Sequence, residues 1–375
     1  MMSAQANPEQ VIVFRKKLLS YSETFIADQG HFLPTYRPVY AGFSKDNSGL
    51  KLIADATQYH LIDFSALPSL SKLLFRRNLG GGSQWINAMR QYAPGLIHAH
   101  FFNDGVDAIK LGQRLDIPVV TTLHGHDITK HANAKSGSTE TRSFFQRVDK
   151  VIAVSNFIAA QAISRGCPEN KLIQHYIGID LERFQQEKCE SEQPTLLFVG
   201  RLVEKKGCSY LLQAMERLHA EFPELELTIV GEGPLKATLQ QEAIDKTLRV
   251  NFVGTEPADS IRQRLATSWL FVAPSITAAS GDAEGLGMVF LEAQALKTPV
   301  VSFRSGGVVE AVADGITGLL CNEKDVGKLT DNIRQLLNDA DLRMQMGKQG
   351  RQRVEQQFDI RKQCERLEQI YTEVR

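Results

Sequence analysis

Two glutamates bracket an otherwise apolar, glycine-punctuated run in this 375-residue chain. Residues 280–303 read SGDAEGLGMVFLEAQALKTPVVSF, with Glu284 in the glycine-rich part and Glu292 in the apolar part. A buried apolar segment does not accommodate an unpaired carboxylate, so each glutamate needs a partner or a ligand. The pattern therefore indicates a site as well as core packing.

Gly285 and Gly287 predict a sharp turn into a helix that begins near Leu286. The first N–H groups of such a helix and its dipole favour phosphate. On a helix, the eight residues from Glu284 to Glu292 would span about 12 Å and return to within about 80° of the starting face, so both carboxylates could point the same way. Two hydroxyl-binding carboxylates beside an anion site suit a nucleotide-sugar. The alternative is a helix-capping Glu284 and a surface Glu292.

A second candidate is the segment FVGRLVEKKG, residues 198–207, in which Arg201 and Lys206 follow an apolar strand pattern. Two cations at the carboxyl end of a strand suit a diphosphate leaving group, because guanidinium binds it bidentately and ammonium acts as a point charge. A solvated surface loop is the alternative.

The third candidate is TTLHGHDI, residues 121–128, where a buried strand pattern runs into His124, His126 and Asp127. Ile128 and Thr129 follow Asp127 and are not metal ligands, and no other His/Cys cluster has ligand spacing, so we expect no metal site. A histidine at a strand end can instead bond a sugar or an acceptor. A structural histidine is the alternative.

Short β-branched runs alternate with helical patterns throughout the chain, which predicts parallel sheets covered by helices on both faces. The expected strands are residues 10–14, 37–43, 95–101, 118–125, 150–155, 171–179, 195–201, 225–233, 249–254, 269–275 and 299–303. The polar stretch 181–195 separates two such sets. We therefore expect an α/β protein with two doubly wound, Rossmann-like domains, 1–185 and 186–375, in which the last helix can pack back on the first domain. Their facing strand ends form the expected ligand cleft.

The composition is that of a globular protein, with 43% hydrophobic and 23% charged residues and a net charge of zero. Nothing in it points to nucleic acid. Residues 1–188 hold 21 Lys and Arg against 16 Asp and Glu, an excess that fits an anionic surface or a chance distribution. The five scattered cysteines, and the absence of a signal-peptide or membrane-spanning pattern, predict a cytoplasmic protein with reduced thiols.

Together, the three segments resemble the retaining glycosyltransferases of the GT-B fold, in the large family that contains bacterial mannosyltransferases and sucrose synthases. The resemblance is strongest from 195 to 320, through GRLVEKKG, VGEGP, EGLGMVFLEA and GGVVEAVADGITGLL. It is looser in the first half, through TTLHGHD, VIAVSNF and GIDLERF. It implies hexose transfer from a UDP- or GDP-linked sugar with retention of configuration, without a metal or other cofactor.

The resemblance also assigns catalytic roles to four residues. Glu284 is expected to bind the hydroxyls of the donor sugar near the reacting carbon, and His124 to contact the same sugar. Arg201 and Lys206 are expected to clamp the diphosphate.

Five further residues are expected to bind the donor. Leu286 and Gly287 would donate backbone N–H groups to the diphosphate, and Glu292 would bind the ribose. Val253 lies where such enzymes hold the base through main-chain contacts, and Asp127 is expected beside the donor next to His124.

Two segments depart from the common family pattern. The first strand-to-helix loop reads RKKLLSYSETFIADQ (15–29) where many relatives carry a glycine pair, and YIGID (176–180) replaces a Pro-Asn-Gly sequence. Both variants resemble a branch associated with bacterial surface polysaccharides. We therefore expect a glycan or lipid-linked acceptor. The alternatives are a small soluble acceptor, an NAD-dependent oxidoreductase and a non-catalytic sugar-binding domain.

Residues 67–78, LPSLSKLLFRRN, combine leucines with Lys72, Arg76 and Arg77. A basic amphipathic helix of this kind can rest on an anionic membrane surface, at the inner face of the plasma membrane. An ordinary helix with a charged outer face is the alternative.

Overall fold

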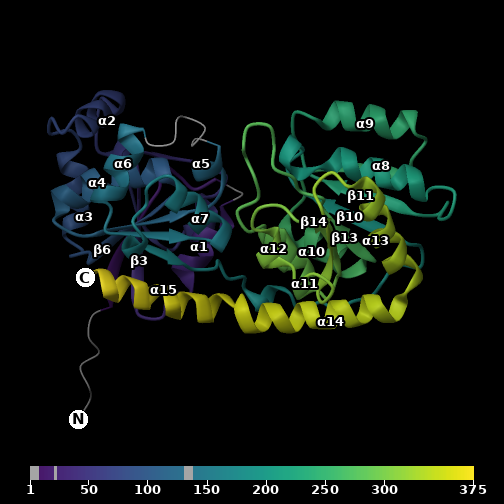
Figure 1. Ribbon diagram of the computed structural model, residues 1–375. Coiled ribbons are helices and arrows are strands. Elements are labelled where there is room, and N and C mark those ends of the chain that lie inside the picture. The colour runs from purple at the N-terminus through teal and green to yellow at the C-terminus, as the bar shows by residue number, and fades with distance from the viewer. Residues whose placement is uncertain (1–7, 21–22, 131–137) are drawn as a thin grey trace, which may run out of the picture. The chain divides into compact units, whose positions relative to one another are not determined.

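The computed structural model describes residues 8–20, 23–130 and 138–375. The chain divides into two compact units, each built on its own parallel sheet (Figure 1). Unit 1 comprises Met1–Gly178 and Ile360–Arg375, and unit 2 comprises Ile179–Asp359. The division thus falls before the boundary expected after residue 185, and the last helix belongs to unit 1.

Unit 1 contains a seven-stranded sheet in the order β5-β3-β1-β6-β7-β8-β9. Its strands are β1 (Glu9–Phe14), β3 (Tyr36–Gly42), β5 (Thr57–His60), β6 (Leu96–His100), β7 (Val119–Leu123), β8 (Lys150–Ala153) and β9 (Leu172–Gln174); β2 (Lys17–Leu18) and β4 (Ser44–Lys45) pair separately. Every residue of β6 and β7 is buried, as expected for central parallel strands that are covered on both faces.

The helices of unit 1 are α1 (Thr24–His31), α2 (Pro68–Arg76), α3 (Ser83–Arg90), α4 (Phe102–Leu115), α5 (His126–Thr129), α6 (Thr139–Arg147), α7 (Asn156–Ser164) and α15 (Ile360–Val374). In α15, Ile360, Cys364, Leu367 and Tyr371 recur at helical spacing and pack on the buried residues of the sheet. Glu368 of the same helix accepts hydrogen bonds from the backbone N–H groups of Thr35, just before β3, and of Tyr36, the first residue of β3. These contacts explain why the C-terminal helix is part of unit 1.

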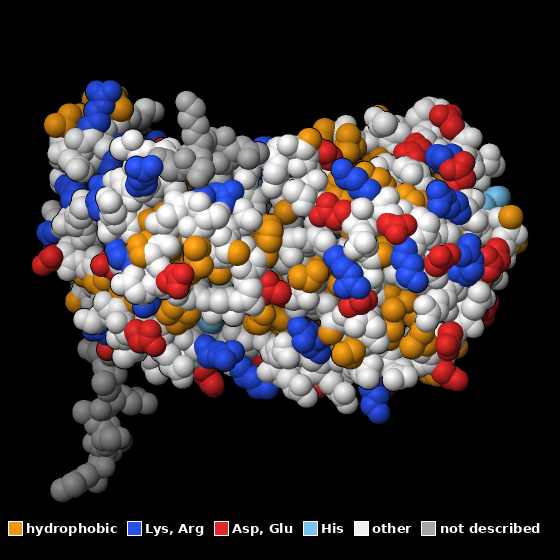
Figure 2. Space-filling model, in the orientation of Figure 1, with side chains coloured by type: hydrophobic (Ala, Val, Ile, Leu, Met, Phe, Trp, Pro, Cys, Tyr) orange, Lys and Arg blue, Asp and Glu red, His pale blue; other side chains and the backbone are white. Residues whose placement is uncertain are grey.

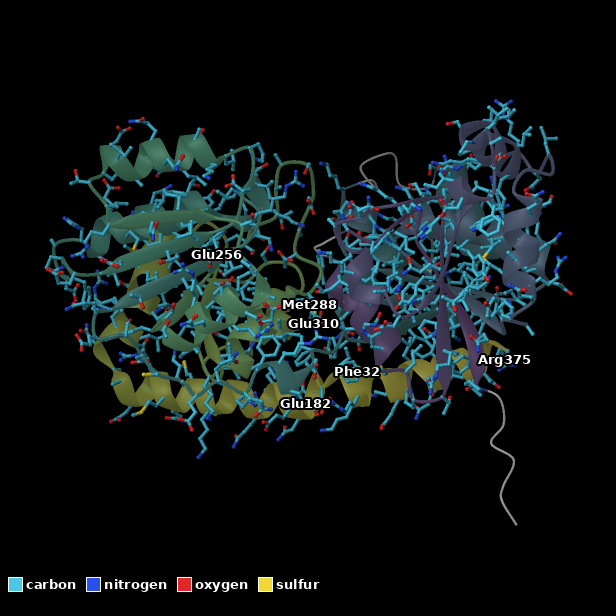
Figure 3. The ribbon with its side chains drawn as sticks, turned by 180° about the vertical axis from the view of Figure 1, so that it is seen from behind. Phe32, Glu182, Glu256, Met288, Glu310 and Arg375 are labelled. Carbon is cyan, nitrogen blue, oxygen red and sulfur yellow. The ribbon has the colours of Figure 1, made fainter. Side chains whose placement is uncertain are left out.

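Unit 2 contains a six-stranded sheet in the order β12-β11-β10-β13-β14-β15. Its strands are β10 (Thr195–Val199), β11 (Glu226–Val230), β12 (Val250–Gly254), β13 (Leu270–Val272), β14 (Val300–Phe303) and β15 (Gly318–Cys321). Its helices are α8 (Cys208–Leu218), α9 (Lys236–Asp245), α10 (Ala258–Thr267), α11 (Met288–Ala295), α12 (Val308–Ala311), α13 (Val326–Asn338) and α14 (Ala340–Gln357). Figure 3 labels Met288, where α11 begins, and Glu310 in the adjacent α12.

The predicted fold class, α/β with two doubly wound Rossmann-like domains, is confirmed. The strand expected at 171–179 is shorter, because only Leu172–Gln174 pairs with β8. Strand β5 was missed, because Thr57–His60 forms a half-buried edge strand without an apolar run. No helix in the described parts of the chain combines the length and the apolar character needed to cross a bilayer.

Each main sheet has one point where the strand order reverses. In unit 1 it lies between β1 and β6, and in unit 2 between β10 and β13. The loops that leave neighbouring strands there run in opposite directions and open a crevice at the carboxyl ends, where doubly wound proteins bind ligands. All three candidate segments follow strands at or next to these two points.

Candidate active site

In unit 2, the loop after β10 meets the loop after β13. Gly207 adopts a left-handed conformation, with φ of 63°, and a Cβ atom there would lie 1.8 Å from the Pro274 carbonyl oxygen. The Ile276 N–H also donates to the Lys205 carbonyl, at 2.8 Å. Glycine is therefore needed at 207 for the two loops to approach each other.

Two ion pairs join these loops. Lys206 Nζ lies 2.6 Å from Glu284 Oε2, with the two side chains 15% and 12% exposed. Lys205 Nζ lies 3.0 Å from Asp282 Oδ1, at similar exposure. The partner of Glu284 is therefore Lys206, one of the two cations predicted to bind the diphosphate. The pair between Lys205 and Asp282 was not predicted.

The charge state of Glu284 follows from this environment. Burial acts to raise its pKa, but Lys206 and Lys205, together with the hydrogen bond from Lys206, outweigh burial and hold the pKa below its ordinary value. Glu284 is therefore ionised at neutral pH. An ionised carboxylate accepts hydrogen bonds only, which suits sugar hydroxyl groups.

The backbone of Glu284 is fixed by the segment that follows β14. The Gly307 N–H donates to the Glu284 carbonyl, at 2.8 Å. A Cβ atom at Gly306 would lie 2.4 Å from that same oxygen, and one at Gly307 would lie 2.0 Å from the Gly285 carbonyl oxygen. Both positions therefore need glycine. No role was predicted for this segment from the sequence, although its two adjacent glycines were a signal.

Helix α11 begins at Met288, two residues later than expected, with Gly287 as its N-cap at φ of 86°. Glu284 consequently lies in the preceding loop, whereas Glu292 lies in the second turn of the helix. The expectation that both carboxylates share one helical face is wrong, because the left-handed Gly287 redirects the chain between them. Leu286 and Gly287 still precede the helix, where its first N–H groups lack intrahelical partners.

The other predicted residues of unit 2 are dispersed. Arg201 is exposed at the start of the loop after β10, and Glu292 is half-buried in α11. Val253 is half-buried in β12, at the edge of the sheet and two strands from β10. Val253 lies in the carboxyl half of its strand, Arg201 follows a strand, and Glu292 lies within α11. This arrangement fits an extended ligand such as a nucleotide.

In unit 1, His124 follows β7 and lies among aromatic rings. Its ring centroid is 4.6 Å from that of Phe101 and 4.8 Å from that of Phe25, and its Nε2 lies 3.1 Å from His100 Nδ1. Burial, followed by the charge of Arg15, lowers the pKa of His124 well below its ordinary value. His124 is therefore a neutral imidazole.

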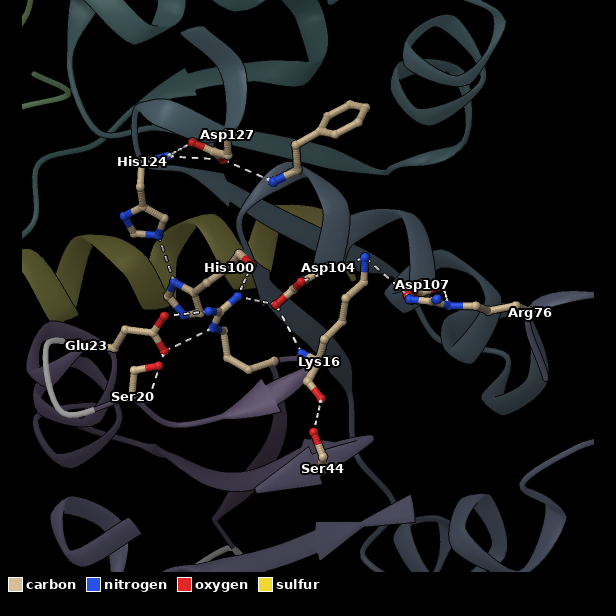
Figure 4. A network of polar contacts seen from close by, with 12 residues as sticks. Lys16, Ser20, Glu23, Ser44, Arg76, His100, Asp104, Asp107, His124 and Asp127 are labelled. Carbon is tan, nitrogen blue, oxygen red and sulfur yellow. Dashed lines mark hydrogen bonds and ion pairs between the residues drawn. The ribbon is translucent and has the colours of Figure 1, made fainter. Parts of the chain in front are cut away.

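Asp127 is buried, and its carboxylate accepts hydrogen bonds from the backbone N–H groups of Phe102 (3.0 Å), His124 (3.1 Å) and Gly125 (2.8 Å) (Figure 4). Through these bonds, the carboxylate oxygens of Asp127 hold the turn that carries His124. The geometry favours a positioning role for Asp127 over the ligand contact expected from the sequence.

A network of charged residues surrounds the end of β1 (Figure 4). Arg15 binds Glu23 and Asp104, and its guanidinium lies 4.3 Å from the centroid of Phe101. Lys16 Nζ lies 3.3 Å from the buried Asp107, which also binds Arg76. This network was not predicted from the sequence. Its only signal was the unusual basic start of the first strand-to-helix loop.

Among residues 8–20, 23–130 and 138–375, no group of three or more His, Cys, Asp or Glu side chains could hold a metal ion. The five cysteines all lie in the described residues, and none of them forms a disulfide bond there.

Comparisons with known proteins match this organisation. A family model described as Glycosyl transferases group 1 matches residues 180–353, and one described as Glycosyltransferase Family 4 matches residues 28–183. The structure of Anabaena Alr3699/HepE in complex with UDP-glucose aligns with a TM-score of 0.77 over 97% of this chain and 99% of that chain, at 19% identity. That similarity shows the fold.

Two curated relatives are closer in sequence. The GDP-mannose-dependent monoacylated alpha-(1-6)-phosphatidylinositol monomannoside mannosyltransferase of Corynebacterium glutamicum is 31% identical, over 67% of this chain and 69% of its own. The amylovoran biosynthesis glycosyltransferase AmsK of Erwinia amylovora is 31% identical, over 66% of this chain and 62% of its own. These matches decide against an NAD-dependent oxidoreductase. The chain belongs to the group 1 family of glycosyltransferases, with a fold of the GT-B type.

Proposed function

We propose that this glycosyltransferase moves a hexose from a UDP- or GDP-linked sugar to a glycan or lipid-linked acceptor in bacterial surface polysaccharide synthesis, with retention of configuration. The observation that carries the proposal is the Lys206–Glu284 pair, which places a carboxylate and a cation together where the strand order reverses in unit 2. In a sugar diphosphate, the sugar hydroxyl groups can bind the Glu284 carboxylate, and the charge of the diphosphate leaving group can bind the Lys206 ammonium.

In this mechanism, the ionised Glu284 holds the donor sugar by its hydroxyl groups. Arg201, Lys206 and the N–H groups at Leu286–Gly287 stabilise the charge that grows on the departing diphosphate. These groups supply the electrophilic assistance, so no metal or other cofactor takes part. The acceptor attacks an oxocarbenium-like carbon from the face that the diphosphate leaves, which accounts for retention. His124 is assigned to the same sugar.

The comparisons support both UDP- and GDP-linked donors. HepE is described with UDP-glucose, whereas the Corynebacterium relative is named as dependent on GDP-mannose. The names of AmsK and the Corynebacterium enzyme support a polysaccharide or lipid-linked acceptor over a small soluble one.

We also propose that α2 of unit 1 contacts an anionic membrane surface, where a lipid-linked acceptor would reside. Leu67, Leu70, Leu73 and Leu79 lie in or beside α2 and are 65%, 47%, 45% and 63% exposed. In Figure 2, hydrophobic and basic side chains gather over this helix.

Charge favours an anionic bilayer over a neutral partner. Residues 64–103 contain four Lys and Arg, including Arg77 beside the leucines, and no Asp or Glu. Exposed leucines next to basic side chains bind lipid both by apolar burial and by attraction to anionic headgroups. The protein should therefore co-sediment with vesicles that contain phosphatidylglycerol and should not co-sediment with vesicles of phosphatidylcholine alone.

The membrane test uses a paired replacement, Leu70→Ser with Leu73→Ser, which should reduce vesicle binding by roughly tenfold or more. Ile244→Ser is the matched control, because Ile244 is 69% exposed on α9 of unit 2. Equal vesicle binding by the wild type, the leucine variant and the control would contradict membrane docking.

The test of the transfer reaction begins with a thermal-shift screen of UDP-, GDP- and ADP-sugars. A ligand at 100 times its Kd adds about 2.7 kcal/mol to the free energy of unfolding. With the donor identified, NMR of the glycoside product reports the anomeric configuration, and turnover is measured in excess EDTA. An inverted product, or activity lost to EDTA and restored by Mg²⁺ or Mn²⁺, would contradict the mechanism.

A further inference from the structure

Two histidine rings meet at the carboxyl ends of the neighbouring strands β6 and β7 in unit 1. His100 is 1% exposed, and its Nδ1 lies 3.1 Å from Nε2 of His124. The ring planes differ by 28°, and their centroids are 5.3 Å apart. Among the described residues, the aromatic neighbours of the pair are phenylalanines and His98, whose ring centroid lies 4.3 Å from that of His100. The two imidazoles therefore face each other beside phenylalanine rings and next to Arg15, which donates to the His100 carbonyl oxygen.

Both rings are neutral. Burial is the largest cause that lowers the pKa of His100 well below its ordinary value, and His98, His124 and Arg15 add to it. Burial also dominates for His124. The nearby carboxylates Glu23 and Asp104 do not reverse this, because both are engaged by the guanidinium of Arg15.

Neutrality couples the two rings. A neutral imidazole has one N–H and one lone pair, so a bond between two such rings needs one donor and one acceptor. The ring that donates at the shared bond must present a lone pair at its other nitrogen, and the ring that accepts must present an N–H there. The tautomers of His100 and His124 are therefore coupled, because fixing either one fixes the other.

The nitrogen controlled in this way on His124 is Nδ1. Within the described residues, Nδ1 of His124 has no hydrogen-bond partner, and the backbone of His124 is held by Asp127. His98 cannot compete for the shared bond, because its Nδ1 and Nε2 are bonded to the hydroxyls of Tyr371 (2.7 Å) and Thr122 (2.6 Å).

We propose that His100 is a positioning residue that fixes the tautomer of His124, and thereby decides whether His124 offers an N–H or a lone pair to a sugar hydroxyl. The identity of that ligand rests on the proposed function, whereas the coupling of the two rings does not. A fixed tautomer allows His124 to bind a hydroxyl without first rearranging its proton, which lowers the cost of ordering the site.

The direct test is NMR of the full chain with ¹⁵N-labelled histidine and no ligand, with the His124 signals assigned by their loss in His124→Gln. Of the two nitrogens at the shared bond, one should carry a proton and the other should not, with a ¹⁵N–¹⁵N coupling across the hydrogen bond. Two protonated nitrogens there, or no coupling, would overturn the inference without any variant.

Variants extend the test. His100→Phe keeps a ring but removes the bond, so His124 should show averaged tautomers. His175→Gln is the matched control. His175 is also buried in unit 1, but its Nε2 bonds the Gln363 carbonyl oxygen at 2.8 Å, away from His124.

Kinetics separate this inference from the proposed function. His100→Phe should lower kcat by roughly tenfold with little change in donor KM, whereas the His175→Gln control should not. Unchanged His124 signals in His100→Phe would overturn the inference. Changed signals with unchanged kcat would uphold the coupling and remove His124 from the reaction.

Discussion

Replacing Glu284 by glutamine keeps the side-chain size and an oxygen acceptor but removes the charge that Lys206 pairs with. The pair is 2.6 Å long and both side chains are largely buried. At an effective dielectric constant of about 20, their gross attraction is about 6 kcal/mol, most of which desolvation offsets. Because the amide still accepts a hydrogen bond, we expect the free energy of unfolding to fall by about 2 kcal/mol.

The effect on catalysis should be larger and separate from stability. The proposed carboxylate contacts strengthen as positive charge develops on the sugar, so Glu284→Gln should lower kcat by on the order of 10²-fold while the donor still binds. Asp282→Asn is the matched control, because it removes the neighbouring pair with Lys205 at similar distance and exposure. Asp282→Asn should lower the free energy of unfolding by a similar amount and should change kcat little.

The assays are chemical denaturation, donor titration and turnover for both variants, followed by a double-mutant cycle of Glu284→Gln with Lys206→Met. A coupling free energy of about 1–3 kcal/mol is expected for groups in direct contact. A cycle without coupling would refute the ion pair. Full turnover in Glu284→Gln would refute the catalytic role and leave the fold unaffected.

Three further predictions concern the same unit. Glu292→Ala should chiefly weaken donor binding with kcat preserved, because ribose contacts exist in ground and transition states alike; wild-type affinity by calorimetry would remove Glu292 from the site. Arg201→Ala and Lys206→Ala should each lower kcat by on the order of 10²-fold, and full turnover in either would refute the diphosphate clamp. Because the pKa of Glu284 is lowered on folding, its stabilisation should be complete above about pH 4.5 and lost as pH falls through the folded pKa. The free energy of unfolding of the wild type should therefore fall more steeply below pH 4.5 than that of Glu284→Gln. Parallel curves of this free energy against pH would contradict the prediction.

The hydrophobic pattern was sufficient to predict two doubly wound domains and to locate the chemistry-bearing residues at strand ends. A buried parallel strand reads as a short apolar run, and the residues just after it reach the carboxyl edge of the sheet whatever the order of the strands. Arg201, Lys206, His124 and Glu284 could therefore be named from local sequence and family resemblance. The same reasoning failed for β5, whose edge position removes the apolar signal.

Only the tertiary structure decided which of these residues meet. Lys206 and Glu284 are 78 positions apart, and Arg15 and Asp104 are 89 apart. Their contact depends on β10 lying beside β13 and on β1 lying beside β6. Buried parallel strands look alike in sequence, so their order is not encoded in the periodicity that reveals them. The turn at Gly287 likewise depends on a local dihedral angle, and one of the backbone bonds of Asp127 is to Phe102, which is distant in the chain. A carboxylate or a glycine therefore acquires its role from the residues that pack against it.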